Sequence, residues 1–238
     1  MMDCISVENM RLSDAETIEK YVPSLVLMHR AAYGVFLAHG WQGRTAILCG
    51  SGNNGGDGYA LSCILAEKGF DCAVFTLGTK KSPDSAHYAE KAAALGVPVS
   101  AFTPGCLEGF HTVVDCLLGT GFQGAVRQDY RSAIEAINHS PAYKISVDIN
   151  SGMNGDTGEA ETAALSDLTV TIGFVKHGLV TENADQYMKR LVCADIGIRL
   201  LKQEIKLCTE AEWASGAKDL PGHMLAPNWL DMTVIRCF

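Results

Sequence analysis

Several kinds of segment are missing from this sequence of 238 residues. No apolar stretch is long enough to cross a bilayer. The N-terminal MMDCISVENM has no hydrophobic region of the kind found in secretory signals. No long basic run occurs, and the formal net charge is −8. The sequence therefore disfavours nucleic acid and an anionic membrane as partners.

Paired cysteines and clustered histidines are also missing. The nine cysteines are odd in number, include no CxxC pair, and several lie in apolar runs where a thiol behaves as a small buried hydrophobe. The seven histidines show no metal-ligand spacing. We therefore expect a reduced, cytoplasmic protein without a disulfide framework or a zinc site.

What the sequence does contain is a regular alternation of short apolar strands and helices. Apolar residues make up 47% of the chain, which is typical of an ordered globular protein. The alternation predicts a doubly wound, Rossmann-like α/β fold with a mostly parallel sheet and helices on both faces. The expected strands are 45–50, 72–78, 112–119, 143–149, 167–174 and 190–197, and the expected helices between them are 57–68, 82–95 and 129–138.

The two ends of the chain add to this pattern. Two extra helices are expected before the first strand, one starting at a capping box formed by Ser13 and Glu16, the other after Pro23. We expect residues 1–200 to form one domain and residues 201–238 to form a C-terminal helix over 201–218 with an irregular tail. The tail shows no clear period, and it is read either as a tail or as the beginning of a second domain.

The first strand leads into the glycine-rich stretch GSGNNGGDG at 50–58, which contains a GxGxxG pattern. It lacks the Lys-Ser/Thr pair of an ATP-binding P-loop. The second strand ends in Leu77-Gly78-Thr79, without the acidic residue that holds a ribose, which disfavours an ordinary NAD-dependent dehydrogenase. Asp57 is expected at the helix start, where it would suit the helix dipole but compete with a phosphate. The alternative is a plain strand-to-helix turn.

Three further polar stretches, 115–124, 148–158 and 173–178, also follow strands. Ligands of open parallel sheets bind outside the carboxyl ends of the strands, so we expect all four stretches to meet in one crevice. Asn54, Asp115 and Ser151 supply oxygen atoms there, which suits a hard cation, and the single carboxylate favours a monovalent ion. Taken singly, each of these residues is more often a turn or cap residue.

Asp148 and Lys176 also fall at this edge of the sheet. For Asp148 a ligand-facing carboxylate and a turn or cap residue stay open as alternatives. For Lys176 the alternatives are a contact with the ligand and a place in a solvated loop.

The stretches GNNGGDGY at 52–59, VDCLLGTGFQG at 114–124 and SVDINSGMNGDTG at 146–158 resemble the NAD(P)H-hydrate epimerase family, of the YjeF N-terminal domain type. GFVKHGL at 173–179 and ADIGI at 194–198 match more weakly, and MRLSDAETIE is similar to the family's opening helix. The resemblance covers roughly residues 5–200.

The resemblance implies an isomerase that interconverts the R and S epimers of hydrated NADH and NADPH, a form of nicotinamide cofactor repair. It also implies potassium as cofactor, a homodimer, and a functional link to an ATP- or ADP-dependent hydrate dehydratase. The implied potassium ligands are Asn54, Asp115 and Ser151. The implied substrate contacts, to which we add Lys176, are Asn53, Asn54, Gly55, Gly56, Asp57, Gly119, Thr120, Gly121, Phe122, Gln123, Gly124, Ala125 and Asp148.

The chain departs from the family pattern at two places. Asn150 stands where the family usually has proline, which is expected to loosen the loop because it restores an N–H and frees φ. LMHRAA at 27–32 lacks the family's Glu and Asn after the methionine, so no role in substrate binding or dimer formation is assigned there. The alternative function is a non-catalytic nucleotide-binding or protein-interaction module, which predicts loss of Asp115 or Asp148, yet both are present.

Asp148 is the expected acid/base residue. Epimerisation requires the hydroxyl of the hydrated ring to leave and water to return on the other face. A carboxyl group can donate and accept the proton and can stabilise the cationic intermediate. Asp115 is less suited because a cation would hold its oxygens, and Asp57 because a helix start would lower its pKa.

Overall fold

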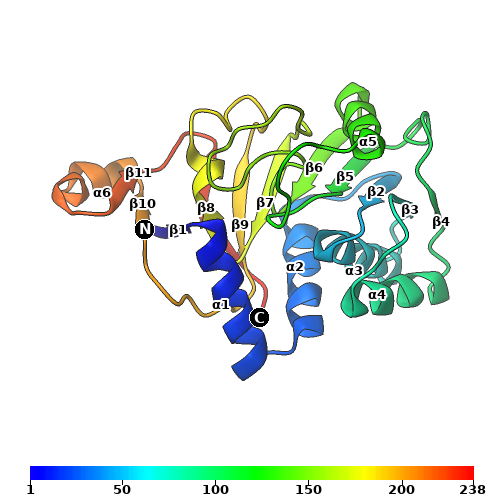
Figure 1. Cartoon of the computed structure of the whole chain (residues 1–238), viewed down its shortest axis with the longest axis horizontal. Coiled ribbons are helices and arrows are strands. Elements are labelled where there is room, and N and C mark those ends of the chain that lie inside the picture. The colour runs from blue at the N-terminus through cyan, green and yellow to red at the C-terminus, as the bar shows by residue number, and fades with distance from the viewer.

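A computed structural model describes all residues from 1 to 238, and its centre is one eight-stranded parallel sheet (Figure 1). The strands are β2 (Thr45–Cys49), β3 (Cys72–Thr76), β4 (Val99–Ala101), β5 (Thr112–Cys116), β6 (Tyr143–Val147), β7 (Leu168–Ile172), β9 (Leu191–Asp195) and β12 (Leu230–Arg236). Their order across the sheet is β12-β9-β7-β6-β5-β2-β3-β4, and every neighbouring pair is parallel. The doubly wound α/β fold predicted from the sequence is confirmed.

Helices cover both faces of this sheet, as expected. In Figure 1, helices lie both below and above the sheet. The lower helices are α2 (Ser24–Ala38), α3 (Asn53–Glu67) and α4 (Pro83–Ala94), and the upper helix is α5 (Gln128–His139). β2, β5 and β7 are buried at every position, as parallel strands covered on both sides must be.

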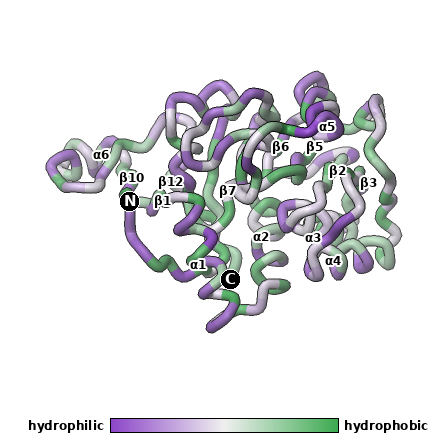
Figure 2. Tube along the Cα trace, in the orientation of Figure 1, coloured by the Kyte–Doolittle hydropathy of each residue, from purple (hydrophilic) through white to green (hydrophobic).

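The core divides along the same layers. One hydrophobic cluster fills the face under α2, α3 and α4, and a second lies under α5. Figure 2 shows the hydrophobic colour gathered on β7 and its neighbours, while much of α5 on the outside is hydrophilic. The sheet is therefore a rigid support for the loops at its ends.

Strand order reverses between β2 and β5. The chain proceeds from β2 to β3 and β4 in one direction, then crosses back to β5 and continues through β6, β7 and β9 in the other. The two loops that leave neighbouring strands here run apart, which opens a crevice at the carboxyl ends of β2 and β5.

The N-terminal part departs from the sequence prediction in one detail. The first helix, α1, spans Val7–Lys20, and its N-cap is Ser6, whose side chain accepts a hydrogen bond from the Asn9 amide at 3.3 Å. The predicted capping box at Ser13 is wrong: Ser13 is fully buried within the helix, and its hydroxyl donates to Asn9. The earlier start adds nearly two turns to α1 and turns one face of it toward the crevice.

The C-terminal part differs more strongly. The helix predicted over 201–218 is wrong for most of its length, and the segment after it is not irregular. The chain forms β10 (Ile205–Cys208), the short α6 (Glu210–Ala214), a 3₁₀ turn (Ala217–Asp219), β11 (His223–Leu225) and β12. β12 pairs with β9 and completes the edge of the large sheet. The pairing of β12 with β9 buries Leu230. A search for helical periodicity in the sequence does not predict this burial.

A second, four-stranded sheet lies at the same end of the molecule. Its order is β11-β10-β1-β8, where β1 is Met2–Ile5 and β8 is Val175–Lys176, which a 3₁₀ turn (His177–Val180) follows. Figure 1 shows this sheet and α6 projecting from the left of the large sheet, with the N-terminus beside them. The nine cysteines are all free, and no helix is both long and apolar enough to span a membrane.

Candidate active site

A cavity of about 840 Å³ lies at the strand-order reversal. Its floor is the start of α3, one wall is the loop that follows β5, and the end of β6 contributes Asp148. α1 and α2 close the opposite side with apolar side chains such as Met10, Ile18 and Leu27. The four stretches that the sequence predicted to converge therefore do not contribute equally, because 173–178 does not line the cavity.

The glycine loop is shaped by close backbone approaches. A Cβ atom at Gly50 would lie 1.9 Å from the carbonyl oxygen of Leu117, and one at Gly55 would lie 2.0 Å from the carbonyl oxygen of Gly50. Only glycine fits at these two positions. α3 begins at Asn53, so its first free N–H groups face the cavity, and this arrangement suits an anion.

Asn54 is the most unusual polar side chain of the loop. It is 8% exposed, it lines the cavity, and neither Oδ1 nor Nδ2 has a hydrogen-bond partner. A Cβ atom at Gly119 would lie 3.2 Å from Asn54 Cβ and 3.3 Å from Asp148 Oδ2, so Gly119 is flanked by these two side chains. Because an orphaned buried amide is costly, its presence indicates a bound polar group or ion.

Asp115 and Ser151 are not part of the cavity lining. Both are buried, and the Ser151 hydroxyl donates to Asp115 Oδ1 while the Ser151 amide donates to Oδ2 at 2.9 Å. The Leu118 amide donates to the Ser151 hydroxyl at 2.9 Å, which ties this pair to the loop that carries Gly119. Burial raises the pKa of Asp115, although these hydrogen bonds oppose the rise. No ammonium or guanidinium group pairs with the Asp115 carboxylate.

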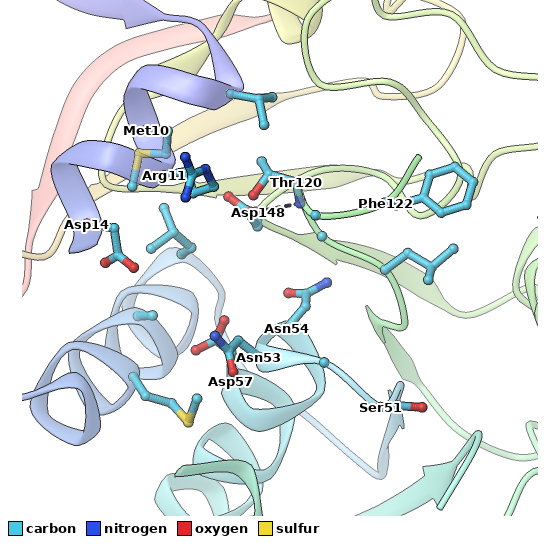
Figure 3. A pocket seen from close by; sticks show the side chains of 18 of the residues that line it. Met10, Arg11, Asp14, Ser51, Asn53, Asn54, Asp57, Thr120, Phe122 and Asp148 are labelled. Carbon is cyan, nitrogen blue, oxygen red and sulfur yellow. Dashed lines mark hydrogen bonds between the residues drawn. The ribbon is translucent and has the colours of Figure 1, made fainter. Parts of the chain in front are cut away.

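Asp148 is the only non-glycine residue with positive φ, at 70°. Aspartate tolerates this left-handed conformation better than most residues. Its Oδ2 accepts from the Thr120 amide at 3.3 Å, and its Oδ1 forms an ion pair with the ammonium group of Lys176 (Figure 3 shows Asp148 beside Thr120). Lys176 is fully buried, and it also donates to Thr171 Oγ1 at 3.0 Å and to the Ile172 carbonyl at 2.7 Å.

Asp57 departs from its predicted setting. Because α3 begins at Asn53, Asp57 lies in the second turn rather than at the helix start. Its pKa is raised well above its usual value, first by burial and then by the charges of Asp148 and Asp14, against a lowering by Lys176. The pKa of Asp14 is raised by burial and by Asp148. The expectation that the helix dipole would lower the pKa of Asp57 is therefore wrong.

The other candidate residues fall into two groups. The cavity is lined by Asn53, Asn54, Asp57, Gly119, Thr120, Gly121, Phe122, Gln123, Ala125 and Asp148. Gly55, Gly56, Gly124, Lys176, Asp115 and Ser151 are not part of its lining. Lys176 is neither in a solvated loop nor at the cavity surface, which differs from both readings of the sequence. No group of three or more His, Cys, Asp or Glu side chains is arranged to hold a metal ion.

The sequence reading missed the contribution of α1. Met10, Arg11, Asp14 and Ile18 all line the cavity, and 10, 14 and 18 are spaced as one face of a helix. This spacing was visible in the sequence, but a helix that started at Ser13 would not have included Met10. In the LMHRAA stretch, Met28 lines the cavity, whereas the Arg30 guanidinium donates to the Ile196 carbonyl at 3.0 Å.

Asn150 does not loosen its loop. Its side chain is fully buried, and Nδ2 donates to the carbonyls of Ala164 and Tyr187 at 2.8 and 3.0 Å. Oδ1 accepts from the Thr169 hydroxyl at 2.7 Å. Without proline, φ of residue 150 is not fixed by a ring. The side-chain hydrogen bonds of Asn150 restrict the loop instead, because they tie it to three separate segments.

We expect Asn150→Ala to lower the free energy of unfolding by on the order of 2–4 kcal/mol, because it leaves several buried polar groups without partners. Urea unfolding measures the change. Asn183→Ala is the matched control, since Asn183 is exposed and makes one side-chain hydrogen bond, to the Thr157 carbonyl. Equal stability of the two variants would contradict the role of Asn150.

The fold and the cavity define a Rossmann-like α/β domain with a ligand site at the strand-order reversal. Residues 24–178 match the family model of the YjeF-related protein N-terminus. The chain belongs to this family.

The names of similar proteins are consistent with this family. The chain is similar to the bifunctional NAD(P)H-hydrate repair enzyme Nnr of Archaeoglobus fulgidus, with 34% identity over 83% of this chain and 42% of that protein. It is 34% identical to the NAD(P)H-hydrate epimerase of Limosilactobacillus fermentum over 80% of this chain and 95% of that one. The chain thus spans less than half the length of the bifunctional relative and nearly all of the epimerase. The crystal structure of yeast ynu0 matches in fold, with a TM-score of 0.70, 18% identity, and coverage of 85% and 97% of the two chains.

Proposed function

We propose that this protein is an NAD(P)H-hydrate epimerase, an isomerase that interconverts the R and S forms of hydrated NADH and NADPH. The observation that carries the proposal is the cavity at the strand-order reversal, where the start of α3, the loop at 119–125 and Asp148 meet. Its volume is at the upper end of the range typical of small-molecule pockets, which suits a nucleotide. Membership of the family and the names of the relatives support the same activity.

The chemistry that the site must support is the loss and return of water at the hydrated ring carbon. When the hydroxyl leaves as water, the ring nitrogen supplies an electron pair and the ring becomes an iminium cation. Asp148 accepts the proton in this proposal: its carboxylate faces the cavity, stabilises the cation by its charge, and takes up the proton that the returning water releases. The ion pair with Lys176 and the Thr120 amide hold it in one orientation.

The phosphates of the substrate are assigned to the first turn of α3 and to the loop at 119–125. The free N–H groups of Asn53 and its neighbours attract anions, and glycines at 119, 121 and 124 let the backbone approach closely. Gly55 and Gly56 shape this turn from below the surface.

Potassium is part of the proposal, with Asn54, Asp115 and Ser151 as ligands. The residues fit such an ion. Asn54 has a buried carbonyl oxygen without a partner, and Asp115 is a buried carboxylate without a cationic group to pair with. When bound, a monovalent cation would neutralise Asp115 and hold the two loops together.

Asp115→Ala should abolish any dependence of activity on potassium, because it removes the only charged ligand. Epimerisation rates in potassium and in choline buffers, at equal ionic strength, measure the dependence. Asp115→Asn, which retains hydrogen-bonding capacity with Ser151, serves if the alanine variant does not fold. Equal rates of the wild-type protein in the two buffers would rule out the cation.

We further propose a homodimer in the cytoplasm that works with an ATP- or ADP-dependent hydrate dehydratase. The bifunctional relatives, which include those of Archaeoglobus fulgidus and Methanothermobacter thermautotrophicus, support the link to a second repair activity. The nine free thiols support a reducing compartment.

The activity is tested with purified single epimers of the two hydrates. Added protein should convert each pure epimer into a mixture faster than buffer alone, as followed by chromatography. No acceleration for either cofactor hydrate would refute the proposed function.

A further inference from the structure

Four carboxyl groups line the cavity, and three of them lie close enough together for their charges to interact. Asp14 comes from α1, Asp57 from α3 and Asp148 from the end of β6, and Figure 3 shows all three around one space. The charge of Asp148 raises the pKa of both Asp14 and Asp57, and the charge of Asp14 also raises the pKa of Asp57. Neighbouring ionised carboxylates in a cavity repel one another, so three of them are not stable together without cations.

Only one cation is buried beside them. The Lys176 ammonium group is committed to Asp148, with Thr171 and the Ile172 carbonyl as its other acceptors. The Arg11 guanidinium lines the cavity but is bonded to Glu8 through two hydrogen bonds of 2.9 and 2.8 Å. Lys80 and Arg127 also line the cavity, but both side chains are exposed to solvent. Asp84 is the fourth carboxyl group of the lining.

Asp148 and Asp57 therefore differ in their hydrogen-bond and ion-pair partners. Both oxygens of Asp148 accept from N–H donors, one of them charged, which suits the ionised carboxylate. Asp57 has no hydrogen-bond or ion-pair partner among the residues of the chain, and the carboxyl groups of Asp14 and Asp148 lie near it. This setting raises the pKa of Asp57 well above its usual value, chiefly through burial.

A second observation points to a polar ligand in this space. Asn54 lies one turn before Asp57 on α3, is more than nine-tenths buried, and presents both amide atoms without partners. Figure 3 shows Asn54 and Asp57 on the same helix, with Asp148 across the space from them. A ligand that hydrogen-bonds to Asn54 lies in the cavity that Asp57 and Asp148 also line.

We propose that Asp57 is the neutral carboxylic acid that protonates the leaving hydroxyl, while Lys176 is a positioning residue that holds the Asp148 carboxylate by an ion pair. This inference rests on the proposed function. It separates the roles of two carboxyl groups by their surroundings, as in other enzymes that pair an acid with a base.

The proton balance closes over one turnover. The Asp57 proton moves to the hydroxyl oxygen, the carbon–oxygen bond breaks with its electron pair, and water leaves as the ring nitrogen forms the iminium double bond. Water then adds to the other face of the ring carbon, the double-bond pair returns to nitrogen, and the released proton passes to Asp148. From there it returns to Asp57, which restores the ion pair of Asp148 with Lys176.

The test compares Asp57→Asn with Asp14→Asn and with Asp71→Asn, a surface control whose residue pairs with Arg44 away from the cavity. Asp57→Asn should lower kcat by about 10²–10⁴-fold and leave the affinity for a cofactor nucleotide nearly unchanged. Asp71→Asn should match the wild type. In the wild type, kcat should fall as pH rises through the pKa of Asp57, since the acid form is required; Asp57→Asn should lack this fall.

A measurement independent of activity accompanies the kinetics. The infrared difference spectrum of wild type against Asp57→Asn, near neutral pH, should contain the band of a protonated carboxyl group. Its absence would overturn the inference, as would near wild-type kcat in folded Asp57→Asn, or a loss confined to Asp14→Asn. If the wild type does not epimerise either hydrate, both the inference and the proposed function are overturned; epimerisation that survives Asp57→Asn overturns the inference alone.

Discussion

Asp148→Asn is expected to lower kcat by about 10²–10⁴-fold while the protein stays folded and binds nucleotide. The amide keeps the size of the side chain and the contact with the Thr120 amide, but it has no charge to stabilise an iminium ion and no basic oxygen for the proton of returning water. Because the loss arises in the transition state, kcat and kcat/KM should fall together.

The kinetic constants of purified Asp148→Asn, measured with single epimers, give the result. Asp185→Asn provides a surface control, since Asp185 is exposed and makes no hydrogen bond or ion pair. A folded Asp148→Asn protein with near wild-type kcat would transfer the base role to another carboxyl group, Asp14 or Asp57.

Lys176→Met should be strongly destabilising. The ammonium group is fully buried, and its removal leaves the carboxylate of Asp148 without its cation, together with unpaired acceptors on Thr171 and Ile172. Breaking a buried ion pair by removing one partner costs about 3–5 kcal/mol. In a chain of this length the melting temperature should then fall on the order of 10 °C.

Lys176→Arg and the double variant Lys176→Met with Asp148→Asn separate charge from packing. Arginine keeps the charge and should recover part of the activity. The double variant should be more stable than Lys176→Met alone, because no unpaired carboxylate remains. Thermal unfolding of the wild type, Lys176→Met, Asp148→Asn and the double variant measures the stability effect, and epimerisation rates measure the recovery by Lys176→Arg. Additive losses in the double variant would contradict the ion-pair explanation.

The sequence predicted the parts of the fold that depend on local pattern. Buried parallel strands such as β2 and β5 are short apolar runs, and the glycine-rich stretches at their ends are unmistakable. The C-terminal strands could not be predicted in the same way, because the pairing of β12 with β9 depends on a contact between segments that are far apart in the sequence. The start of α1 at Ser6 rather than Ser13 was missed because two serines offered similar caps.

In the candidate site, too, some features follow from local sequence and others depend on packing. Asn54, Asp57 and Asp148 were predicted to face the crevice because they follow strands or open a helix, and all three line the cavity. The burial of Lys176 and the raised pKa of Asp57 could not be inferred, because both depend on what packs around the side chain. Asn150 illustrates the point: its backbone freedom predicted a loose loop, whereas its side chain fixes three segments.

The most direct test of the account is epimerisation in ¹⁸O-labelled water. Purified protein is mixed with either pure epimer of NADH hydrate or NADPH hydrate, and the epimer ratio and the label in the ring hydroxyl are followed by chromatography and mass spectrometry. The account predicts that both starting epimers approach the same ratio, and that the newly formed epimer carries the label because water leaves and returns. An unchanged ratio, or epimerisation without incorporation of the label, would contradict it.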